Sequence, residues 1–277
     1  MKSRKLFCEI SPLTYQISLF KCRFVRHLQN TFSSIKFSDE ISIEPLPVLI
    51  YKQNSLMRRK LGNIDLQLQE NKVVNLKLSI PNVSGVIIKP NETFSFWHLV
   101  KKCTESKGYL PGLTISNGSA SCGIGGGLCQ FTNLIHWLTL HTPLKITEHH
   151  HHDGMDLFPD YGRQIPFGTG TSIMYNHVDY RFKNTTDQPF QLIIYTSDEY
   201  LCGEIRTMSP LTVKYHIKSE DERFIRVEND VFRVGKVFRE CIDKTTGNVI
   251  FKELIKENYA KVMYPMDESK IEVLPSI

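Results

Sequence analysis

The stretch Gly123-Ile124-Gly125-Gly126-Gly127-Leu128-Cys129-Gln130 lies near the middle of a chain of 277 residues and places four glycines before a cysteine and an amide. The residues that follow carry an apolar pattern with helical spacing: Phe131, Leu134, Ile135 and Leu138. Pro143 limits how far this helix can extend. The pattern therefore predicts a glycine-rich loop that leads into a helix, with Cys129 in or just before its first turn and an end near Leu140.

The position of Cys129 has chemical consequences. The first backbone N–H groups of a helix are unpaired and carry the positive end of its dipole. A thiolate placed there is stabilised, and its pKa can fall to between roughly 3.5 and 7.5. The alternative is that Cys129 is buried and packs as a small hydrophobic residue, as free cysteines often do.

The composition is that of an ordinary globular protein and excludes several classes. Hydrophobic residues make up 41% of the chain and charged residues 23%, which is typical of globular domains. The net charge of +5 is too small to indicate a nucleic-acid partner. The seven cysteines are scattered and form no CxxC pair, so we expect a reducing compartment and no disulfide framework.

No segment has the pattern of a signal peptide or a membrane-spanning helix. Glu9 and Lys21 interrupt the apolar run that a signal peptide would need. No apolar stretch reaches about 18 residues, the length that indicates a transmembrane helix. We therefore expect a cytoplasmic location, and nothing in the sequence indicates a cofactor.

A basic amphipathic helix is predicted near the N-terminus, with Ser11 as its cap and Pro12 at its first position. One face is apolar and contains Leu13, Ile17, Phe20, Phe24 and Leu28. Lys21, Arg23, Arg26 and His27 occupy the rest. We expect the apolar stripe to pack on the domain, with a weak contact of residues 13–28 with a membrane surface as the alternative.

The remainder of the chain is predicted to be mostly β. Alternating apolar and polar residues predict a half-buried strand at 74–80, and a short apolar run predicts another at 86–88. Residues 179–183 and 190–194, separated by a turn, are predicted to form a hairpin. From Leu211 onward the pattern remains β-like.

Together these elements predict an α+β fold with a mixed, mostly antiparallel sheet, a basic N-terminal helix and a central helix after the glycine-rich loop. We expect three parts. Residues 1–55 form an N-terminal helical segment, residues 56–205 form the core, and residues 206–277 form a β-rich extension packed on that core.

Six short segments carry a further signal: Gln69–Val73, Asn75–Leu78, Glu92–Trp97, Gly125–Gln130, His141–Leu144 and Asp179–Asn184. Together they resemble the VanW family, which is named from glycopeptide-resistance gene clusters, and the resemblance covers roughly Leu56 to Ile205. It implies a link to vancomycin resistance or the cell envelope. The implied partner is a peptidoglycan precursor or an envelope peptide, and no biochemical activity is settled for the family.

The sequence departs from the family pattern at two places. Where relatives have Glu-Arg-x-x-His, this chain has Glu148, a histidine in the place of the arginine, and then His152. Where relatives have Pro-x-Gly-x-Asp-Ala-Thr, Gly170 stands in the place of the aspartate. If that acid orients a catalytic base in relatives, Asp179 or Asp153 would have to serve here, or this member is altered in activity.

Three interpretations of the site are open, and we favour a binding module. In it, the backbone of Gly125–Gly127 binds a ligand without catalysis, and Glu148 and aromatic side chains complete the groove. The aromatic residues are Phe94, Phe96 and Trp97, for which packing in the core is the alternative.

The second interpretation is a cysteine-dependent acyl transferase or amidase. Cys129 would be the nucleophile, His152 its base and Asp179 the acid that orients this base, while the glycine loop and Gln130 would donate hydrogen bonds to the oxyanion. It requires the Cys129 sulfur and the His152 ring to line one cleft within reach of each other.

The third interpretation is zinc binding by Cys122, Cys129 and the histidine run 149–152. The spacing of these residues matches no common structural zinc site, so we expect no metal.

Overall fold

The computed structural model describes residues 6–59, 65–116, 119–151, 154–160 and 165–273. The helices are α1 (Pro12–Phe32), α2 (Leu66–Ser79), α3 (Phe96–Val100) and α4 (Cys129–Leu140). Short 3-10 turns are η1 (Phe7–Glu9), η2 (Ile80–Asn82), η3 (Glu105–Lys107) and η4 (Glu268–Lys270). Helices and sheets both occur in quantity, so the predicted α+β class is confirmed.

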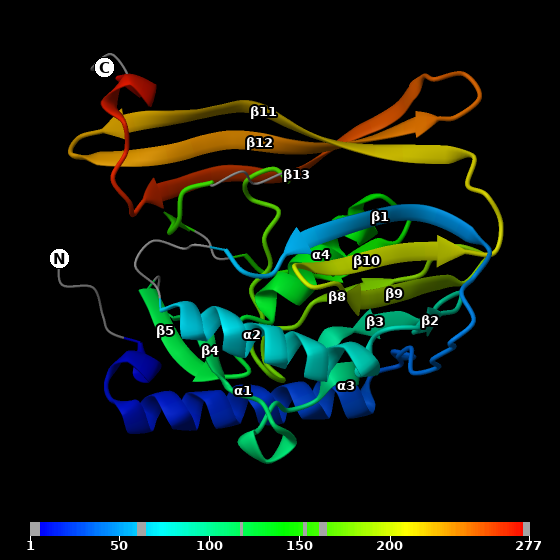
Figure 1. Ribbon diagram of the computed structural model, residues 1–277, viewed down its shortest axis with the longest axis horizontal. Helices are drawn as coiled ribbons and strands as arrows, with labels where there is room; N and C mark the ends of the chain where they lie inside the picture. Colours follow the sequence, from blue (N-terminus) through cyan, green and yellow to red (C-terminus); the bar gives the residue numbers. More distant parts are fainter. Residues whose placement is uncertain (1–5, 60–64, 117–118, 152–153, 161–164, 274–277) are drawn as a thin grey trace.

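The described strands form four sheets, in which neighbouring strands are antiparallel except for the pairs β11–β14 and β13–β7 (Figure 1). The first has the order β1-β10-β9-β2, with β1 (Val48–Leu56), β10 (Tyr200–Thr207), β9 (Phe190–Thr196) and β2 (Ile87–Ile88). The second has the order β14-β11-β12-β13-β7, with β14 (Ile271–Val273), β11 (Val213–Val227), β12 (Asp230–Asp243), β13 (Val249–Val262) and β7 (Met155–Asp156). The smaller sheets are β3-β8-β6, with β3 (Thr93–Ser95), β8 (Arg181–Lys183) and β6 (Lys145–Glu148), and β4-β5, with β4 (Pro111–Ser116) and β5 (Ser119–Ile124).

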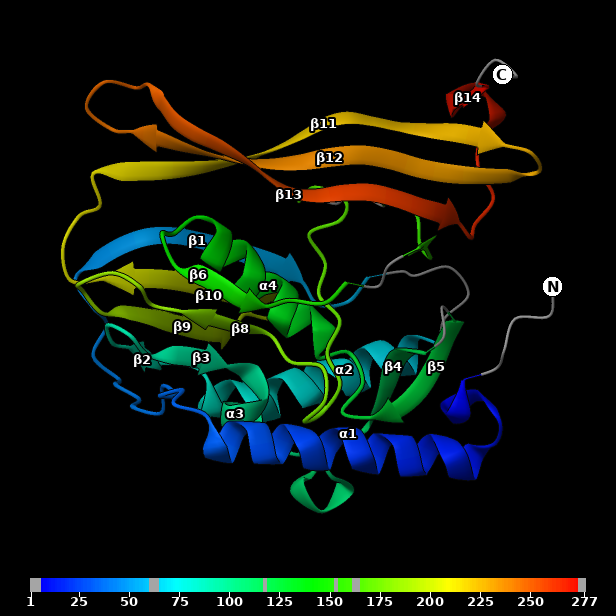
Figure 2. The same cartoon turned by 180° about the vertical axis from the view of Figure 1, so that it is seen from behind.

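The elements are arranged in layers. Figures 1 and 2 show β11, β12 and β13 along one side of the molecule and α1 along the opposite side. The sheet that contains β1, β10 and β9 lies between them, and α4 contacts β1 and β10. The division of the chain into three parts at residues 55 and 205 stays a prediction.

The predicted junction between a glycine-rich loop and a helix is confirmed. α4 begins at Cys129 and ends at Leu140. Its apolar stripe supplies Phe131, Ile135 and Leu138, which are all fully buried in the core. The helix forms here because its apolar period matches the face it turns to the sheet.

The strand predicted at 74–80 is wrong, because these residues lie largely in α2. Asp65 caps the helix by accepting a hydrogen bond from the N–H of Gln67 at 2.9 Å. The buried side chains recur with helical spacing: Gln69, Lys72, Val73, Asn75, Leu76 and Ser79. Four of these six are polar, so the apolar pattern did not reveal the helical period, and the chance alternation at 74–80 imitated a strand.

The hairpin predicted from residues 179–183 and 190–194 is also wrong. β8 pairs with β3 and β6, whereas β9 pairs with β10 and β2. Asn184 is fully buried at the end of β8 and donates hydrogen bonds of 2.8 Å to the carbonyls of Ile88 and Gln188. The turn between the two strands therefore carries the chain from one sheet to another.

The predicted N-terminal helix is present, and Ser11 caps it by accepting a hydrogen bond from the N–H of Thr14. However, its apolar stripe faces away from the protein, with Leu13 and Phe20 being 70% and 73% exposed. The expectation that this stripe packs on the domain is wrong. No helix in the described ranges is long and apolar enough to cross a bilayer.

Polar groups attach α1 to the rest of the protein. Arg26 donates two hydrogen bonds of 2.7 Å to the carboxylate of Glu148, and Arg23 donates one of 3.3 Å to the carbonyl of Tyr175. A bidentate arginine–carboxylate pair has a fixed geometry and is stronger than a neutral hydrogen bond. These contacts hold the polar face of the helix inward, which leaves the apolar face outside.

A close backbone contact and one amide side chain hold the glycine-rich loop in position. A Cβ atom on Gly126 would lie 2.1 Å from the carbonyl oxygen of Gly112. The buried Asn75 of α2 donates to the carbonyls of Leu110 and Gly126, each at 3.0 Å, and accepts from the N–H of Leu110 at 2.8 Å. Only glycine fits at this crossing of the two backbones.

Replacing Gly126 with alanine is expected to lower the free energy of unfolding by about 3 kcal/mol, because the new methyl group would force the two backbones apart. Gly170→Ala is the matched control, since its Cβ would meet only Asn133 Oδ1, at 4.0 Å. Urea denaturation measures both changes. Equal midpoints for the two variants would show that the crossing at Gly126 has no special requirement.

Candidate binding site

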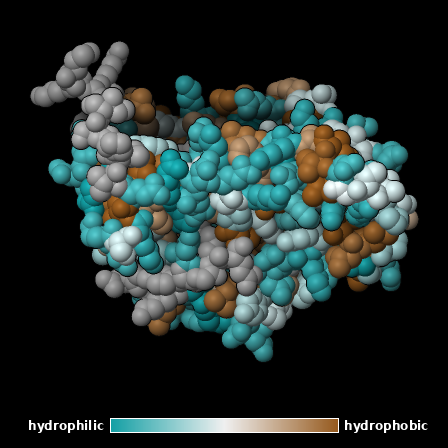
Figure 3. All heavy atoms as spheres, turned by 90° about the horizontal axis from the view of Figure 1, so that it is seen from above, coloured by the Kyte–Doolittle hydropathy of each residue, from teal (hydrophilic) through white to brown (hydrophobic). Residues whose placement is uncertain are grey.

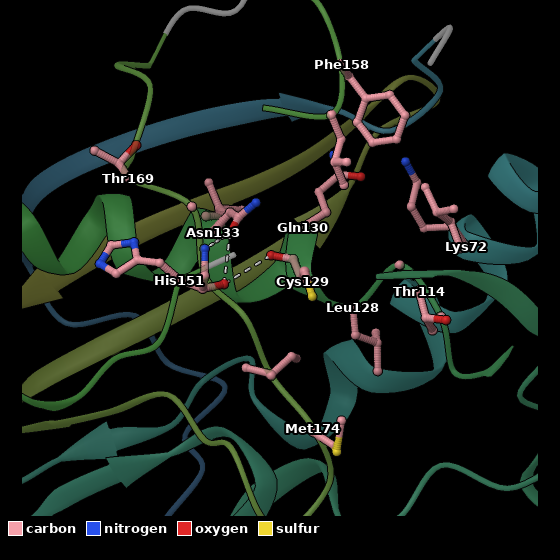
Figure 4. Close-up of a pocket in the computed structure, with 18 of the residues that line it drawn as sticks. Lys72, Thr114, Leu128, Cys129, Gln130, Asn133, His151, Phe158, Thr169 and Met174 are labelled. Carbon is pink, nitrogen blue, oxygen red and sulfur yellow. Dashed lines mark hydrogen bonds between the residues drawn. The ribbon is translucent and has the colours of Figure 1, made fainter. Parts of the chain in front are cut away.

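A pocket of about 1140 Å³ lies beside the glycine-rich loop, with further walls from α2, the start of α4 and β13 (Figure 4). Six of the predicted site residues line it: Gly125, Gly126, Gly127, Cys129, Gln130 and Trp97. Phe94, Phe96, Glu148 and Asp179 do not. The structure thus brings the glycine loop, the thiol and one aromatic residue together and places the other four elsewhere.

The loop has the geometry that requires glycine. Gly125 and Gly127 have φ angles of +74° and +90°, in the left-handed region that other residues rarely adopt. A Cβ on Gly127 would lie 2.3 Å from Cγ of Lys72. The side chain of Lys72 therefore runs directly along the loop and into the pocket.

Lys72 is a buried cation, with only 7% of the residue exposed. Its Nζ donates a hydrogen bond of 2.7 Å to Oε1 of Gln69. Among the residues that the structure describes, no carboxylate pairs with it. Burial, with a smaller effect from the charges of Arg59 and Arg58, lowers the pKa of Lys72 from 10.5 to about 8. The group is still mostly protonated at neutral pH, inside a pocket.

The sequence interpretation missed Lys72. A lysine is ordinarily solvent-exposed, and the prediction of a strand at 74–80 concealed the face of α2. The available signal was the spacing of Gln69, Lys72, Val73 and Leu76, which places an amide, a lysine and two apolar residues on one side of a helix.

The position of Cys129 at the start of α4 does not lower the pKa of its thiol. Burial raises this pKa, and hydrogen bonds from the backbone N–H groups of Ile173 and Cys129 offset the rise only in part. The cost of a charged sulfur in an enclosed environment outweighs the favourable helix terminus.

The side chain of Gln130 forms hydrogen bonds within the fold. Its Nε2 donates hydrogen bonds of 2.8 Å to Ser55 Oγ and to the carbonyl of Leu56. These bonds tie the start of α4 to the end of β1. The amide N–H groups point at these acceptors, so the predicted donation to an oxyanion finds no support in this arrangement.

The described histidines are not placed as a base for Cys129. His152 lies outside the described residues, and its predicted proximity to Cys129 stays a prediction. His151 lines the pocket, but Figure 4 shows its ring directed away from the Cys129 sulfur. The ring of His149 lies between those of His136 and His151, at centroid distances of 4.0 and 4.1 Å. Burial, with the charge of His151, lowers the pKa of His149 to about 4.

Asp179 is 1% exposed and connects elements inside the core. It accepts hydrogen bonds from Ser95 Oγ at 2.6 Å, the Trp97 N–H at 3.1 Å and Arg181 Nε at 2.7 Å. Every one of these donors belongs to the structural framework of β3, α3 and β8. The predicted orientation of a catalytic base by Asp179 has no counterpart among these contacts.

Glu148 pairs with an arginine of α1, Arg26. It forms an ion pair with Arg26 at 2.7 Å and lies 3.5 Å from Arg181. Burial would raise the pKa of Glu148, but the hydrogen bond from the Asp179 N–H and the charge of Arg26 hold it below its usual value. The arginine that contacts Glu148 thus comes from a position 122 residues away in the sequence.

The three aromatic residues separate into two groups. Phe94 and Phe96 are fully buried, Phe94 stacks on Phe182, and both belong to the core. Trp97 lines the pocket, donates its Nε1–H to the carbonyl of Val178 at 3.0 Å and meets the ring of Tyr175 edge to face. Core packing accounts for Phe94 and Phe96, and only Trp97 is available to a ligand.

The described part of the chain gives no support to a metal site. Within it, no group of three or more histidine, cysteine and acidic side chains could hold a metal ion. Cys122 is exposed on β5, and the zinc interpretation has no described ligand set.

The fold and pocket define an α+β protein in which a glycine-rich loop and the polar face of a helix enclose a buried cation. Residues 71–206 match the family described as VanW like protein. The chain is 32% identical over 238 residues to the Vancomycin B-type resistance protein VanW of Enterococcus faecalis (strain ATCC 700802 / V583), which is 86% of each chain. The protein therefore belongs to the VanW family.

A second relative is the Uncharacterized protein YoaR of Bacillus subtilis (strain 168). It is 30% identical over 118 residues, which are 42% of this chain and 36% of that protein. No solved structure matches the chain significantly.

Because burial raises its pKa, Cys129 is expected to resist iodoacetamide at pH 7 and to react only in more alkaline solution. Mass spectrometry of the alkylated protein measures this, with the exposed Cys122 as the internal control that reacts first. Modification of Cys129 before Cys122 at neutral pH would show an activated thiolate and revive the enzyme interpretation.

Lys72→Met is expected to stabilise the protein at pH 7 by about 1–3 kcal/mol. The shift of the pKa from 10.5 to about 8 corresponds to about 3 kcal/mol, and loss of the hydrogen bond to Gln69 offsets part of it. The folded-state pKa lies below the unfolded-state one, so the charge destabilises the folded protein most below about pH 8.

The gain from Lys72→Met should therefore shrink as the pH rises from about 8 to about 10.5. Urea denaturation across this range tests the prediction. The control is Lys77→Met, an exposed position on the same helix, which should change stability little at any pH. A gain for Lys72→Met that stays constant with pH would contradict the burial of its charge.

Proposed function

We propose that this protein is a binding protein whose pocket holds a peptide-like ligand with a carboxylate, of the class of a peptidoglycan precursor or an envelope peptide. The observation that supports this most strongly is Lys72, a buried and protonated amine that faces the pocket and lacks a described carboxylate partner. A buried charge is costly unless an opposite charge pairs with it. A ligand carboxylate would supply that charge.

The charge of the pocket wall points to the same ligand chemistry. Among the described residues that line the pocket, lysines and arginines outnumber acids: Arg23, Arg59, Lys72, Lys102 and Lys256 against Asp156 and Glu257. Asp156 is already engaged by Tyr264, whose hydroxyl donates to it at 2.8 Å. An excess of cations in a concave, partly enclosed site favours an anionic ligand.

The glycine-rich loop suits a peptide or another ligand with a polar backbone. The positive φ angles at Gly125 and Gly127 set the course of the main chain, which forms part of the pocket wall and so offers backbone groups to a ligand. Trp97 adds an aromatic surface beside it. A few polar groups on a largely fixed wall are typical of a ligand-binding pocket.

The catalytic alternative receives less support. The pKa of the Cys129 thiol is raised, and the Gln130 amide donates to β1. A thiol nucleophile needs a base within hydrogen-bond reach, and the ring of His151, the histidine labelled in Figure 4, points away from the Cys129 sulfur. The relative from Enterococcus faecalis is named a vancomycin resistance protein, which fits a ligand from the peptidoglycan pathway. The cytoplasmic location stays a prediction.

The test is calorimetric titration with a peptidoglycan stem peptide that ends in a free carboxylate, and with the same peptide as its C-terminal amide. Wild-type protein should bind the acid at least about tenfold more tightly. Lys72→Met should remove this preference, while the exposed control Lys77→Met retains it. Equal binding of acid and amide by the wild type would refute the proposed role of Lys72.

A further inference from the structure

The outer surface of η1 and α1 is a run of large apolar side chains that the described residues leave uncovered. Each of them is between 38% and 82% exposed: Leu6, Phe7, Ile10, Leu13, Ile17, Phe20, Phe24, Leu28 and Phe32. From Ile10 to Leu28 they recur every three or four residues, so they share one face of the helix. A contiguous exposed apolar surface of this kind marks an interaction site.

The same end of the chain carries all of the excess positive charge. Residues 1–38 contain seven lysines and arginines and one acidic residue, a net charge of +6. The whole chain has a net charge of +5, so residues 39–277 together carry −1. α1 itself contains no acidic residue, and Lys21 and His27 are exposed on it.

The position of α1 in the molecule suits contact with a broad surface. Figures 1 and 2 show it at the edge of the molecule opposite β11, β12 and β13, with the turn around η3 projecting on the same side. Lys101 and Lys102 just before this turn, and Lys107 within it, are exposed. By contrast, hydrophilic residues separate the hydrophobic ones on the face over β11–β13 (Figure 3).

We propose that α1 docks on the surface of an anionic lipid bilayer. The apolar stripe would enter the boundary between headgroups and acyl chains, and the lysines at its flank would contact the phosphate groups. The basic charge argues for lipid and against a second copy of this chain, because a symmetric pairing of two α1 faces would bring like charges together.

The docked helix would also place the pocket beside the bilayer. Tyr15, Leu19 and Arg23 line the pocket, so α1 forms one of its walls while its other face meets the lipid. This inference does not rest on the ligand proposed above, because the apolar stripe and the pocket lie on different faces of α1.

The test is flotation of the full-length protein with vesicles of phosphatidylcholine alone or with about 30% phosphatidylglycerol. Wild type should float with the anionic vesicles and at least about tenfold less with the neutral ones, and Phe20→Ser with Phe24→Ser should stay unbound. The matched control, Ile250→Ser with Leu254→Ser, changes two side chains of similar exposure on β13 and should bind as wild type does.

A second variant separates a lipid contact from a folding defect. Lys21→Glu leaves the apolar stripe in place and should weaken binding to anionic vesicles about fivefold or more, because it reverses a charge at the surface. The proposal fails if wild type does not float with anionic vesicles, or if the double variant in α1 floats as wild type does. It also fails if light scattering shows a dimer of the free protein that the same double variant dissociates.

Discussion

The crossing of the Gly112 and Gly126 backbones is the contact on which the rest of the site depends. The missing Cβ at residue 126 would stand 2.1 Å from a carbonyl oxygen. Asn75 fixes the same crossing from α2 by satisfying three backbone groups with one fully buried amide. Leaving such groups unpaired in the interior would cost about 1–3 kcal/mol each, so the loop, β4 and α2 hold one another in place.

This crossing also explains why α2 buries polar side chains. The helix must present an amide to the loop at Asn75, and one turn earlier it directs Lys72 along Gly127 into the pocket. A lysine in this place weakens the folded protein, as its lowered pKa indicates. A destabilising charge at a pocket is a common feature of binding sites, where the stability of the free protein and affinity for a ligand oppose each other.

The sequence predicted α4 and its junction with the glycine-rich loop because both signals are local: an apolar stripe and a run of glycines. It failed at α2, where the buried face is largely polar. It also failed at β8, which pairs with β3 and β6 and not with the next strand in the chain. Asn184, directly after β8, bonds to the carbonyl of Ile88, a residue distant in the sequence. It also mistook which face of α1 turns inward. The spacing of apolar residues identifies an apolar stripe on α1. Which face of α1 turns toward the protein is decided by the bidentate pair of Arg26 with Glu148. Glu148 lies outside α1, so the sequence pattern of the helix alone cannot reveal it.

The protonation of Lys72 is the most direct test of the account. Carbon and nitrogen NMR of the lysine side chains, assigned with Lys72→Met, gives its pKa in the free protein and with a carboxylate-bearing stem peptide bound. We expect a value of about 8 in the free protein, which the peptide raises because an opposite charge now lies beside the amine. A value of about 10.5 in the free protein, or one that the bound peptide leaves unchanged, would contradict the claim that the pocket is built around a buried cation.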